Sequence, residues 1–266
     1  MKKVGKIYKI RVYLPGFILV MIIEDRKYFK IIKKMVIPIN SSSLVKETGA
    51  KEVQIYIGSK KFLSQHEGVN ENKLLDLNTD ELEKMSSQKS IDHILISWIR
   101  VRAYHFLEKN NCIIMHASAV LFDDSVIIFS GTSGSGKSTI VKLIKGRTLH
   151  DNEIIVKKMN NIFYAFSSPF ASIKTNKRYN YLNGPIKIIY LLKKLRCNRT
   201  IFITKADAFK IIFLNDNKYT HPFTDEMNDV FLNYSDLIQQ IPVKFLYFRK
   251  DDAVKKVIRD DFKNIQ

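Results

Sequence analysis

Short apolar segments separated by turn or charged residues dominate the start of the chain. The segments are Ile7–Leu14, Phe17–Ile23, Tyr28–Ile32, Met35–Ile37 and Val53–Ile57. This pattern is typical of β-strands. Residues 64–90 are polar and contain few large apolar side chains, so we interpret them as a linker with one short helical turn at Asp80–Met85. The pattern therefore predicts a small β-rich N-terminal domain with its linker over residues 1–89.

From residue 90 the spacing of apolar residues changes to that of an amphipathic helix. The residues of this stripe are Ile91, Ile94, Leu95, Trp98, Val101, Tyr104 and Leu107. Ser90 precedes the stripe and is the expected N-cap. We expect the stripe to pack in a core, and we predict that a second, larger domain covers residues 90–266.

Two turns in the second domain join apolar runs as β-hairpins do. Asp123-Asp124 connects Cys112–Phe122 to Ser125–Ser130, and Asn160-Asn161 leads to Phe163–Phe166. Asp and Asn tolerate the backbone conformations of tight turns. We therefore interpret the acidic pair as a turn and not as a catalytic pair.

Further helices and a strand are expected toward the C-terminus. One helix is predicted to begin at Pro185, because proline suits a first helical position. Another, capped by Thr224, is predicted from Met227, Val230, Phe231, Tyr234, Leu237 and Ile238. A buried strand at Val243–Phe248 and a last helix capped by Asp251 or Asp252 complete the pattern.

A complete phosphate-binding sequence follows the apolar run Val126–Phe129, which reads as a buried strand. It is Gly131-Thr132-Ser133-Gly134-Ser135-Gly136-Lys137-Ser138-Thr139, the pattern G-x-x-x-x-G-K-S. Such a loop wraps backbone N–H groups around a β-phosphate, and the N-terminus of the helix behind it favours the same anion. We expect Lys137 to contact the β- and γ-phosphates and Ser138 to ligate Mg²⁺. The sequence therefore predicts that the chain binds a nucleotide, which we take to be ATP, together with Mg²⁺.

Two residues close to this loop are candidates for the chemistry. Asp151 follows Lys137 by fourteen residues and precedes the apolar run Ile154–Val156, at the edge of a strand. A catalytic or metal-ligating carboxylate and a simple turn residue both fit this position, and we favour the first. His116 is either a hydrogen-bonded core histidine or a group beside the phosphates, and both interpretations stay open.

Four segments together resemble the C-terminal catalytic domain of the HPr kinase/phosphorylase family. They are His116–Val120, the loop at 131–139, Leu149–Glu153 and Ser168–Phe170. That family shares its core with phosphoenolpyruvate carboxykinase. The resemblance covers roughly residues 90–260 and implies an α/β fold, with a P-loop kinase core of this type beside the smaller β-rich N-terminal domain.

Two other segments, Asn183–Ile186 and Pro242–Leu246, are similar to the shorter HPr-kinase-like proteins. Some of those are encoded with peptide natural products such as lasso peptides and phosphorylate a serine of the precursor peptide. The resemblance thus implies a serine kinase acting on a peptide or small protein, with Lys137, Asp151 and His116 as catalytic groups. It implies Ser138 and Asp151 as metal ligands.

The chain departs from the family pattern in two ways. Where the family has paired aspartates, this chain has Asp151-Asn152, which puts the role of one carboxylate in doubt. Glu153 is a possible substitute, although strand alternation points it to the other face. The glycine- and arginine-rich signature of the true HPr kinase/phosphorylases is absent, so we expect neither HPr as substrate nor the reverse reaction.

Composition adds limits on location and partners. The net charge of +18 is compatible with an anionic partner, but the lysines are scattered, and we favour a compositional bias over nucleic-acid binding. Cys112 and Cys197 show no metal-ligand spacing, and Phe17–Ile23 is too short to span a bilayer. We expect a cytoplasmic protein with no membrane partner, and a homo-oligomer remains an open alternative.

Several other functions fit the sequence less well than a kinase does. A transport-type ATPase is disfavoured because no LSGGQ-like segment follows the loop. A regulatory GTPase is suggested by Thr204-Lys205-Ala206-Asp207, which imitates the guanine-reading T-K-x-D, but no D-x-x-G is present. A nucleotide-binding regulatory protein, a nucleic-acid kinase and a kinase of a small hydroxyl compound remain alternatives. Arg178, Arg196 and Arg199 are candidates for neutralising phosphate charge.

Overall fold

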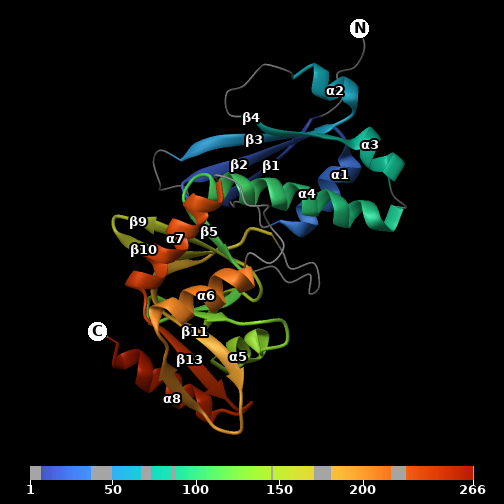
Figure 1. Cartoon of the computed structure of the whole chain (residues 1–266). Coiled ribbons are helices and arrows are strands. Elements are labelled where there is room, and N and C mark those ends of the chain that lie inside the picture. The colour runs from blue at the N-terminus through green and yellow to red at the C-terminus, as the bar shows by residue number, and fades with distance from the viewer. Residues whose placement is uncertain are drawn as a thin grey trace. The chain divides into compact units, whose positions relative to one another are not determined.

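The computed structural model describes residues 7–36, 50–66, 73–85, 88–144, 146–170, 181–216 and 226–265. The chain divides into two compact units (Figure 1): residues 1–106 with 169–178, and residues 107–168 with 179–266. Most of the helix predicted from the apolar stripe groups with the first unit, and its last two residues, Leu107 and Glu108, group with the second. No helix within the described ranges is long and apolar enough to cross a membrane.

The first unit contains a four-stranded sheet with strand order β1-β2-β3-β4. The strands are β1 Tyr8–Leu14, β2 Phe17–Ile23, β3 Lys51–Gly58 and β4 Lys73–Asn78, and the helices are α1 Arg26–Met35, α2 Lys60–Ser64, α3 Thr79–Met85 and α4 Gln88–Glu108. The hairpin β1–β2 is antiparallel, whereas β2, β3 and β4 are parallel and are connected through α1 and α2. The three predicted strands Ile7–Leu14, Phe17–Ile23 and Val53–Ile57 are therefore confirmed.

One predicted strand of this unit is wrong. Tyr28–Ile32 was expected as a strand, but residues 26–35 form α1. Of the segment Met35–Ile37, Met35 ends this helix, Val36 is its C-cap, and Ile37 lies outside the described residues. Tyr28, Ile32 and Val36 are buried at a spacing of four, which is helical periodicity. The carboxylate of Asp25 accepts a hydrogen bond from the backbone N–H of Lys27 at 2.6 Å and caps the helix.

The predicted linker is also more ordered than expected. It contains the strand β4, which pairs in parallel with β3 as the last strand of the sheet. The expected helical turn is the helix α3. Helix α4 begins at Gln88, so Ser90 lies within the helix and is not its N-cap.

The second unit is built on a nine-stranded sheet. Its main path has the order β5-β9-β10-β11-β7-β6-β8, with β13 next to β11 and β12 next to β13. The strands are β5 Cys112–Met115, β6 Ala117–Phe122, β7 Ser125–Ser130, β8 Arg147–His150, β9 Ile154–Met159, β10 Ile162–Ser167, β11 Asn183–Lys194, β12 Arg199–Phe202 and β13 Val243–Phe248. Four helices, α5 Lys137–Ile144, α6 Lys205–Asp216, α7 Glu226–Gln240 and α8 Ala253–Lys263, surround this sheet (Figure 1).

Alternate residues of β7 enter different cores. Val126 and Ile128 belong to a cluster that includes side chains of α6 and α7. Ile127 and Phe129 belong to a second cluster with side chains of α5 and α8. Because successive side chains of a strand point to opposite faces, α6 and α7 cover one face of the sheet, and α5 and α8 cover the other. This burial on both faces explains why β7 is continuously apolar.

Four strands of this sheet end at the same edge. β7, β11 and β13 are mutually parallel, with Leu191 opposite Ser130 and Lys194 opposite Phe248. β8 runs in the same direction, because β6 is antiparallel to both β7 and β8. Ligands of open α/β sheets bind at the carboxyl ends of such strands. The glycine-rich sequence leaves β7 at this edge.

Both predicted hairpins are present. Asp123 and Asp124 have φ values of 44° and 61°, and Asn160 and Asn161 have 48° and 65°. Positive φ at both central residues defines the type I′ turn that joins two-residue hairpins, and Asp and Asn accept it more readily than most residues. Asp123 and Asp124 therefore form a turn between β6 and β7, as expected.

The predicted helix at Pro185 is wrong, because this residue lies in strand β11. Pro185 pairs with Tyr164 of β10 near the start of the strand, where a proline is tolerated. The following run is buried because β11 is central, with β7 on one side and β10 and β13 on the other. A continuous apolar run does not by itself distinguish a buried strand from a buried helix.

The C-terminal elements agree with the sequence. Helix α7 contains the predicted apolar stripe, and β13 has the predicted bounds. The carboxylate of Asp251 accepts from the N–H of Ala253 at 3.1 Å, whereas Asp252, at the N-cap position of α8, makes no capping hydrogen bond with its side chain. The expected cap Thr224 lies outside the described residues.

Candidate functional site

The glycine-rich loop, residues 131–136, connects β7 to the first turn of α5. Gly134 and Gly136 have φ values of 81° and 106°, which favour glycine. A Cβ on Gly136 would lie 2.6 Å from Cζ of Phe248, so the backbone passes close to the ring at the end of β13. The loop is closed by a hydrogen bond from the N–H of Ser135 to the carbonyl of Thr132 at 3.1 Å.

Lys137 folds back on this loop. Its Nζ donates to the carbonyl oxygens of Gly131 at 2.6 Å and Thr132 at 3.2 Å, and only 7% of the residue is exposed. Burial lowers the pKa of Lys137, and the negative charge of Asp216 partly opposes this effect. The ammonium group is thus desolvated and hydrogen-bonded to neutral carbonyls. It lies on the loop to which the motif predicts that phosphates bind.

Two serine hydroxyls of this region are buried with no hydrogen-bond partner among the described residues. They are Oγ of Ser130, at the end of β7, and Oγ of Ser135, within the loop. Ser138, the predicted metal ligand, is exposed in the first turn of α5.

Asp151 lies in a turn that other residues fix in place. The hydroxyl of Ser118 donates to the carbonyl of Asp151 at 2.6 Å. Nδ1 of His150 accepts from the N–H groups of Asn152 at 3.2 Å and Glu153 at 2.9 Å, so that nitrogen carries no proton in this arrangement. Meanwhile Oδ1 of Asp151 is buried and has no hydrogen-bond partner among the described residues. The backbone is held, while one carboxylate oxygen remains available.

Strand register places Asp151 at the same sheet edge as the loop. Ser130 pairs with Ala117 of β6, and His150 pairs with Ala119 of the same strand. β7 and β8 are therefore separated by one strand, which corresponds to about 10 Å. This register explains why Asp151, which is close to the loop in sequence, also lies at the same edge of the sheet as the loop.

His116 lies between β5 and β6, at the position next to the start of the loop. Ala117 pairs with Ser130, so His116 lies beside Gly131 at the sheet edge. Its backbone N–H donates to Oδ1 of Asp216 at 3.0 Å. Through its backbone, His116 thus links the loop region to the end of α6.

Asp216 is a neighbour of the site that the sequence did not reveal. It ends α6, and its Oδ2 lies 3.1 Å from the hydroxyl of Tyr234. Removal of water around the carboxylate raises the pKa of Asp216 to about 7, although hydrogen bonds from His116 and Tyr234 and the charge of Lys137 oppose the increase. Asp216 belongs to no motif, and its partner His116 is 100 positions away, so the sequence gives no signal for this contact.

The T-K-x-D segment has a local structural role. The hydroxyl of Thr204 donates to Oδ2 of Asp207 at 2.6 Å, and the N–H of Asp207 donates to the Thr204 hydroxyl at 3.1 Å. Lys205 donates to the carbonyl of Ile241 at 3.1 Å. These contacts form a helix cap at the start of α6. They account for the sequence without guanine recognition.

The remaining candidates are dispersed. Arg196 is exposed, and the guanidinium of Arg199 lies over the ring of Tyr247, 5.3 Å from its centroid. Phe170 is buried and packs edge-on against Tyr104, with ring centroids 5.7 Å apart. Arg178 lies outside the described residues.

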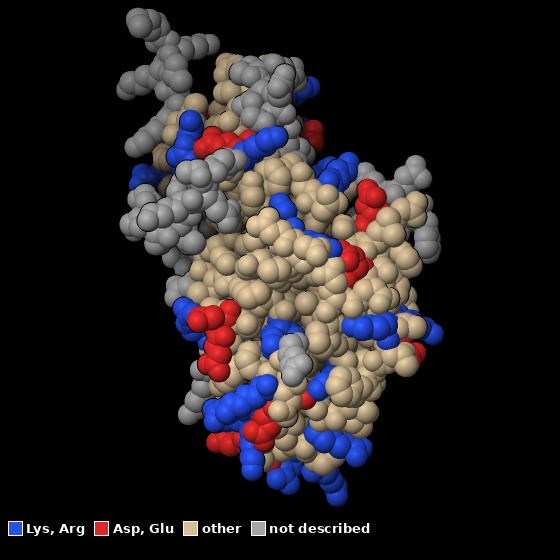
Figure 2. Space-filling view, turned by 90° about the vertical axis from the view of Figure 1, so that its left-hand side faces the viewer, with Lys and Arg blue, Asp and Glu red and all other residues tan. Residues whose placement is uncertain are grey.

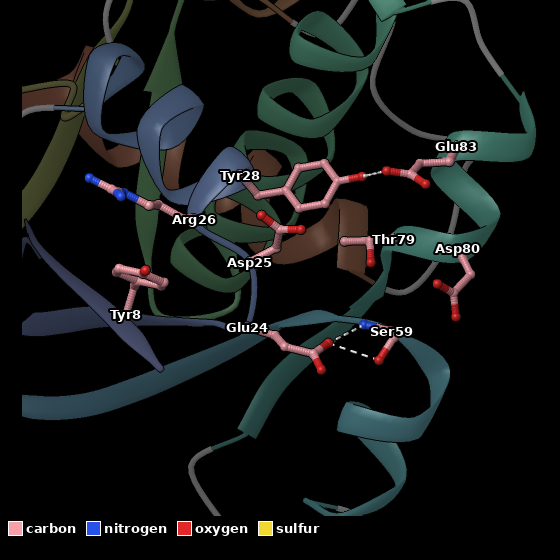
Figure 3. A pocket seen from close by; sticks show the side chains of 9 residues that line it. All are labelled: Tyr8, Glu24, Asp25, Arg26, Tyr28, Ser59, Thr79, Asp80 and Glu83. Carbon is pink, nitrogen blue, oxygen red and sulfur yellow. Dashed lines mark hydrogen bonds between the residues drawn. The ribbon is translucent and has the colours of Figure 1, made fainter. Parts of the chain in front are cut away.

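A separate pocket of about 450 Å³ occurs in the first unit, beyond the carboxyl ends of β2, β3 and β4 (Figure 3). It is lined by Tyr8, Glu24, Asp25, Arg26, Tyr28, Ser59, Thr79, Asp80 and Glu83. Its carboxylates bind the protein itself, as Glu24 accepts from the N–H and hydroxyl of Ser59, both at 2.8 Å. Glu83 accepts from the hydroxyl of Tyr28 at 2.7 Å. An acidic pocket of this kind disfavours phosphates, so the glycine-rich loop is the candidate functional site.

Comparisons with known proteins give little support for any assignment. No protein-family profile and no curated protein matches the chain. One solved structure, described as the Hpr(Ser) kinase/phosphatase from Coxiella burnetii, aligns with 56% of this chain and 95% of its own length. The identity is 12% and the TM-score is 0.31, which is too low to decide fold or activity. The interpretation therefore depends on the loop and the residues around it.

Proposed function

We propose that this protein is an ATP-dependent kinase that transfers the γ-phosphoryl group to a serine or threonine hydroxyl. The acceptor that we propose is a ribosomally made precursor peptide or another small protein. One observation carries the proposal: the G-x-x-x-x-G-K-S loop joins β7 to α5 at one sheet edge. At the same edge lies a carboxylate oxygen of Asp151 that has no hydrogen-bond partner among the described residues.

Phosphate binding would use the loop and the start of α5. The first turn of a helix has N–H groups without partners in the helix, and its dipole favours an anion. Lys137 would exchange the carbonyls of Gly131 and Thr132 for phosphate oxygens. A charged acceptor binds an ammonium more strongly than a neutral carbonyl does, so the exchange is favourable.

The residues present also fit Mg²⁺. This ion takes oxygen ligands and usually combines one or two protein groups with water and substrate phosphates. The exposed hydroxyl of Ser138 is such a group, and so is the oxygen of Asp151 that lacks a hydrogen-bond partner in the described part of the chain. Within the described ranges, no group of three or more His, Cys, Asp or Glu side chains is arranged to hold a metal ion by itself. When bound, Mg²⁺ would neutralise charge on the phosphates.

In the proposed reaction, the acceptor hydroxyl oxygen forms a bond to the γ-phosphorus. The bond between that phosphorus and the β,γ-bridging oxygen breaks, and ADP leaves. Asp151 is the candidate to accept the hydroxyl proton or to hold the metal. Its backbone is fixed by Ser118 and by the His150 turn, so the carboxylate has a defined direction.

Phosphoryl transfer by the purified full-length chain tests this proposal. ATP and GTP are supplied separately, with peptides and small proteins encoded by neighbouring genes, an oligonucleotide, or free serine as acceptor. We expect ATP-dependent addition of one phosphate, seen by mass spectrometry, to a serine or threonine of a peptide or protein. Efficient phosphorylation of free serine with all peptides ignored would contradict the peptide-kinase assignment.

A second candidate is a nucleotide-binding regulatory protein. It is favoured by Asn152, which provides no second carboxylate beside Asp151. The same experiment distinguishes the two functions, because this candidate binds ATP but transfers phosphate to no acceptor.

A further inference from the structure

The hydrogen bonds of Asp216 tie the end of α6 to the turn between β5 and β6. Oδ1 accepts from the N–H of His116 at 3.0 Å, and Oδ2 lies 3.1 Å from the hydroxyl of Tyr234. That hydroxyl is also 3.1 Å from the carbonyl oxygen of Ile114 in β5. Asp216 thus connects α6, α7 and the strand that precedes His116.

These bonds bring a negative charge close to the glycine-rich loop. His116 is beside Gly131 at the sheet edge, and the carbonyl of Gly131 accepts from Nζ of Lys137. The charges of Asp216 and Lys137 stabilise each other. The charge of Asp216 raises the pKa of Lys137, and the charge of Lys137 lowers the pKa of Asp216.

The hydrogen bonds alone do not require a charge at position 216. A hydroxyl has one proton, whereas Tyr234 faces two acceptors, Oδ2 of Asp216 and the carbonyl of Ile114. An asparagine at position 216 could accept from His116 and donate to the tyrosine oxygen, leaving the tyrosine proton for Ile114. Desolvation favours the protonated form of Asp216, whereas the positive charge of Lys137 favours the carboxylate, so the charged form depends on that partner.

We propose that Asp216 is a positioning residue of the phosphate site, acting through Lys137. Without nucleotide, its negative charge holds the Lys137 ammonium on the carbonyls of Gly131 and Thr132. When a nucleotide binds, its phosphates contact that ammonium instead. The carboxylate and the phosphates compete for one cation and repel each other, so Asp216 weakens nucleotide affinity. This role rests on the proposed function, because it concerns the same phosphate site.

Nucleotide affinity of two matched variants tests the competition. Asp216→Asn removes the charge and can keep the hydrogen bonds, whereas Tyr234→Phe removes a hydrogen bond and keeps the charge. At a pH above about 7, where Asp216 is ionised, we expect Asp216→Asn to lower the Kd of Mg-ATP by about three- to tenfold, the effect of one nearby charge at a high effective dielectric constant. Tyr234→Phe should leave the Kd unchanged. An unchanged or weaker affinity in a folded Asp216→Asn variant would overturn the inference.

A double-mutant cycle in urea unfolding tests the charge pair without any nucleotide. It compares Lys137→Met, Asp216→Asn and the double variant with the unaltered protein. We expect the double variant to be more stable than the two single effects predict, because each single change leaves one charge uncompensated. Additive effects would mean that the two charges do not interact, and the inference would be wrong.

The two measurements also separate this inference from the proposed function. If the unaltered protein binds no ATP, the proposed function fails, while the unfolding cycle still decides whether Asp216 is paired with Lys137. If Asp216→Asn does not fold, the carboxyl titration of Asp216, followed by NMR, is compared between the unaltered protein and Lys137→Met. Loss of the lysine should move that titration to higher pH, and an unchanged titration would refute the pairing.

Discussion

Single residues at the end of β7 combine a desolvated cation with polar groups that lack partners. Lys137 contacts only neutral carbonyls, while Ser130 and Ser135 have buried hydroxyls and Asp151 has a buried oxygen without partners in the described structure. A buried polar group without a partner is unfavourable in a folded protein and calls for an explanation, such as a ligand that completes it. Ser130, Ser135 and Asp151 lie at the sheet edge that holds the loop, which agrees with a phosphate site.

Replacement of Lys137 tests the phosphate-binding role. Lys137→Ala should reduce phosphoryl transfer by at least about a hundredfold, because the loop loses its only side-chain cation. The fold should survive, since the lysine donates its hydrogen bonds to two carbonyls of a polar loop. Kinase assays with circular dichroism as the folding control provide the measurement. Phosphate transfer at the original rate would refute the role of the loop.

The carboxylate of Asp151 can be tested with matched neighbours. Asp151→Asn should bind ATP almost normally and lose transfer by at least about a hundredfold, the usual contribution of a general base. Stability should not fall, since Oδ1 makes no hydrogen bond in the described structure. Asn152→Ala and Glu153→Gln are the controls in the same kinetic assay. If these controls abolish transfer while Asp151→Asn does not, the assignment is wrong.

At the level of elements, the glycine-rich loop depends on the strand beside it. Gly136 is in contact range of Phe248 at the end of β13, so the loop has little freedom to shift away from that ring. Gly134 has a similar positive φ, but no heavy atom lies within 4 Å of the position of its Cβ. Substitutions at the two glycines therefore distinguish the effect of packing from that of backbone strain.

Alanine substitutions at these glycines should differ in effect. Gly136→Ala should lower the free energy of unfolding by about 1–3 kcal/mol, because its Cβ would overlap the Phe248 ring. It should also weaken ATP binding. Gly134→Ala should cost only about 1 kcal/mol, from backbone strain. Urea unfolding and ATP titration measure both effects, and equal losses in the two variants would contradict the packing argument.

The sequence predicted the elements that depend on local chemistry. The hairpin turns at Asp123-Asp124 and Asn160-Asn161 need particular backbone angles, and those residue types supply them. The failures at α1 and β11 have a common cause, because a short apolar run fits a helix and a strand equally well. Tertiary position decided both cases, through burial at a spacing of four in α1 and through the central place of β11 in the sheet.

The candidate site was predictable to a similar extent. The loop is a contiguous motif, and Asp151 is close to it in sequence, so both could be named in advance. Asp216 could not, because its link to the site is a hydrogen bond to a backbone N–H 100 positions away. The roles of His116, Ser138 and Asp151 remain predictions.

For the molecule as a whole, the charge of +18 is the property with the clearest consequence. On the face drawn in Figure 2, basic side chains are spread widely and occur among acidic and uncharged ones. Scattered charge attracts an extended anion over long range without specifying its sequence. We expect it to influence the association of a peptide acceptor. We predict that the basic segment 171–184, most of which lies outside the described residues, lines the path of that peptide.

The salt dependence of acceptor binding tests this expectation. The apparent affinity for an acidic or polar peptide should fall steadily between about 0.05 and 0.5 M salt, because the screening length is about 10 Å at 0.1 M. Fluorescence titration of a labelled peptide at each salt concentration measures the trend, with a small hydroxyl compound as the control. A peptide affinity independent of salt would argue for a few short-range contacts.

The order of the strands along the chain also determines at which stage of synthesis the groups of the site come together. Strands β6, β7 and β8 and helix α5 occupy one continuous stretch of the chain. β6 pairs with both β7 and β8, and α5 contacts β6 and β7, so the loop and Asp151 come from neighbouring sequence. Contacts of this kind form early, while distant ones wait for loop closure. The counter-charge at Asp216 arrives only with α6. During synthesis, a chain that has just exposed the glycine-rich loop therefore presents Lys137 without this carboxylate, and the restraint on the lysine begins when the ribosome has released the later helices.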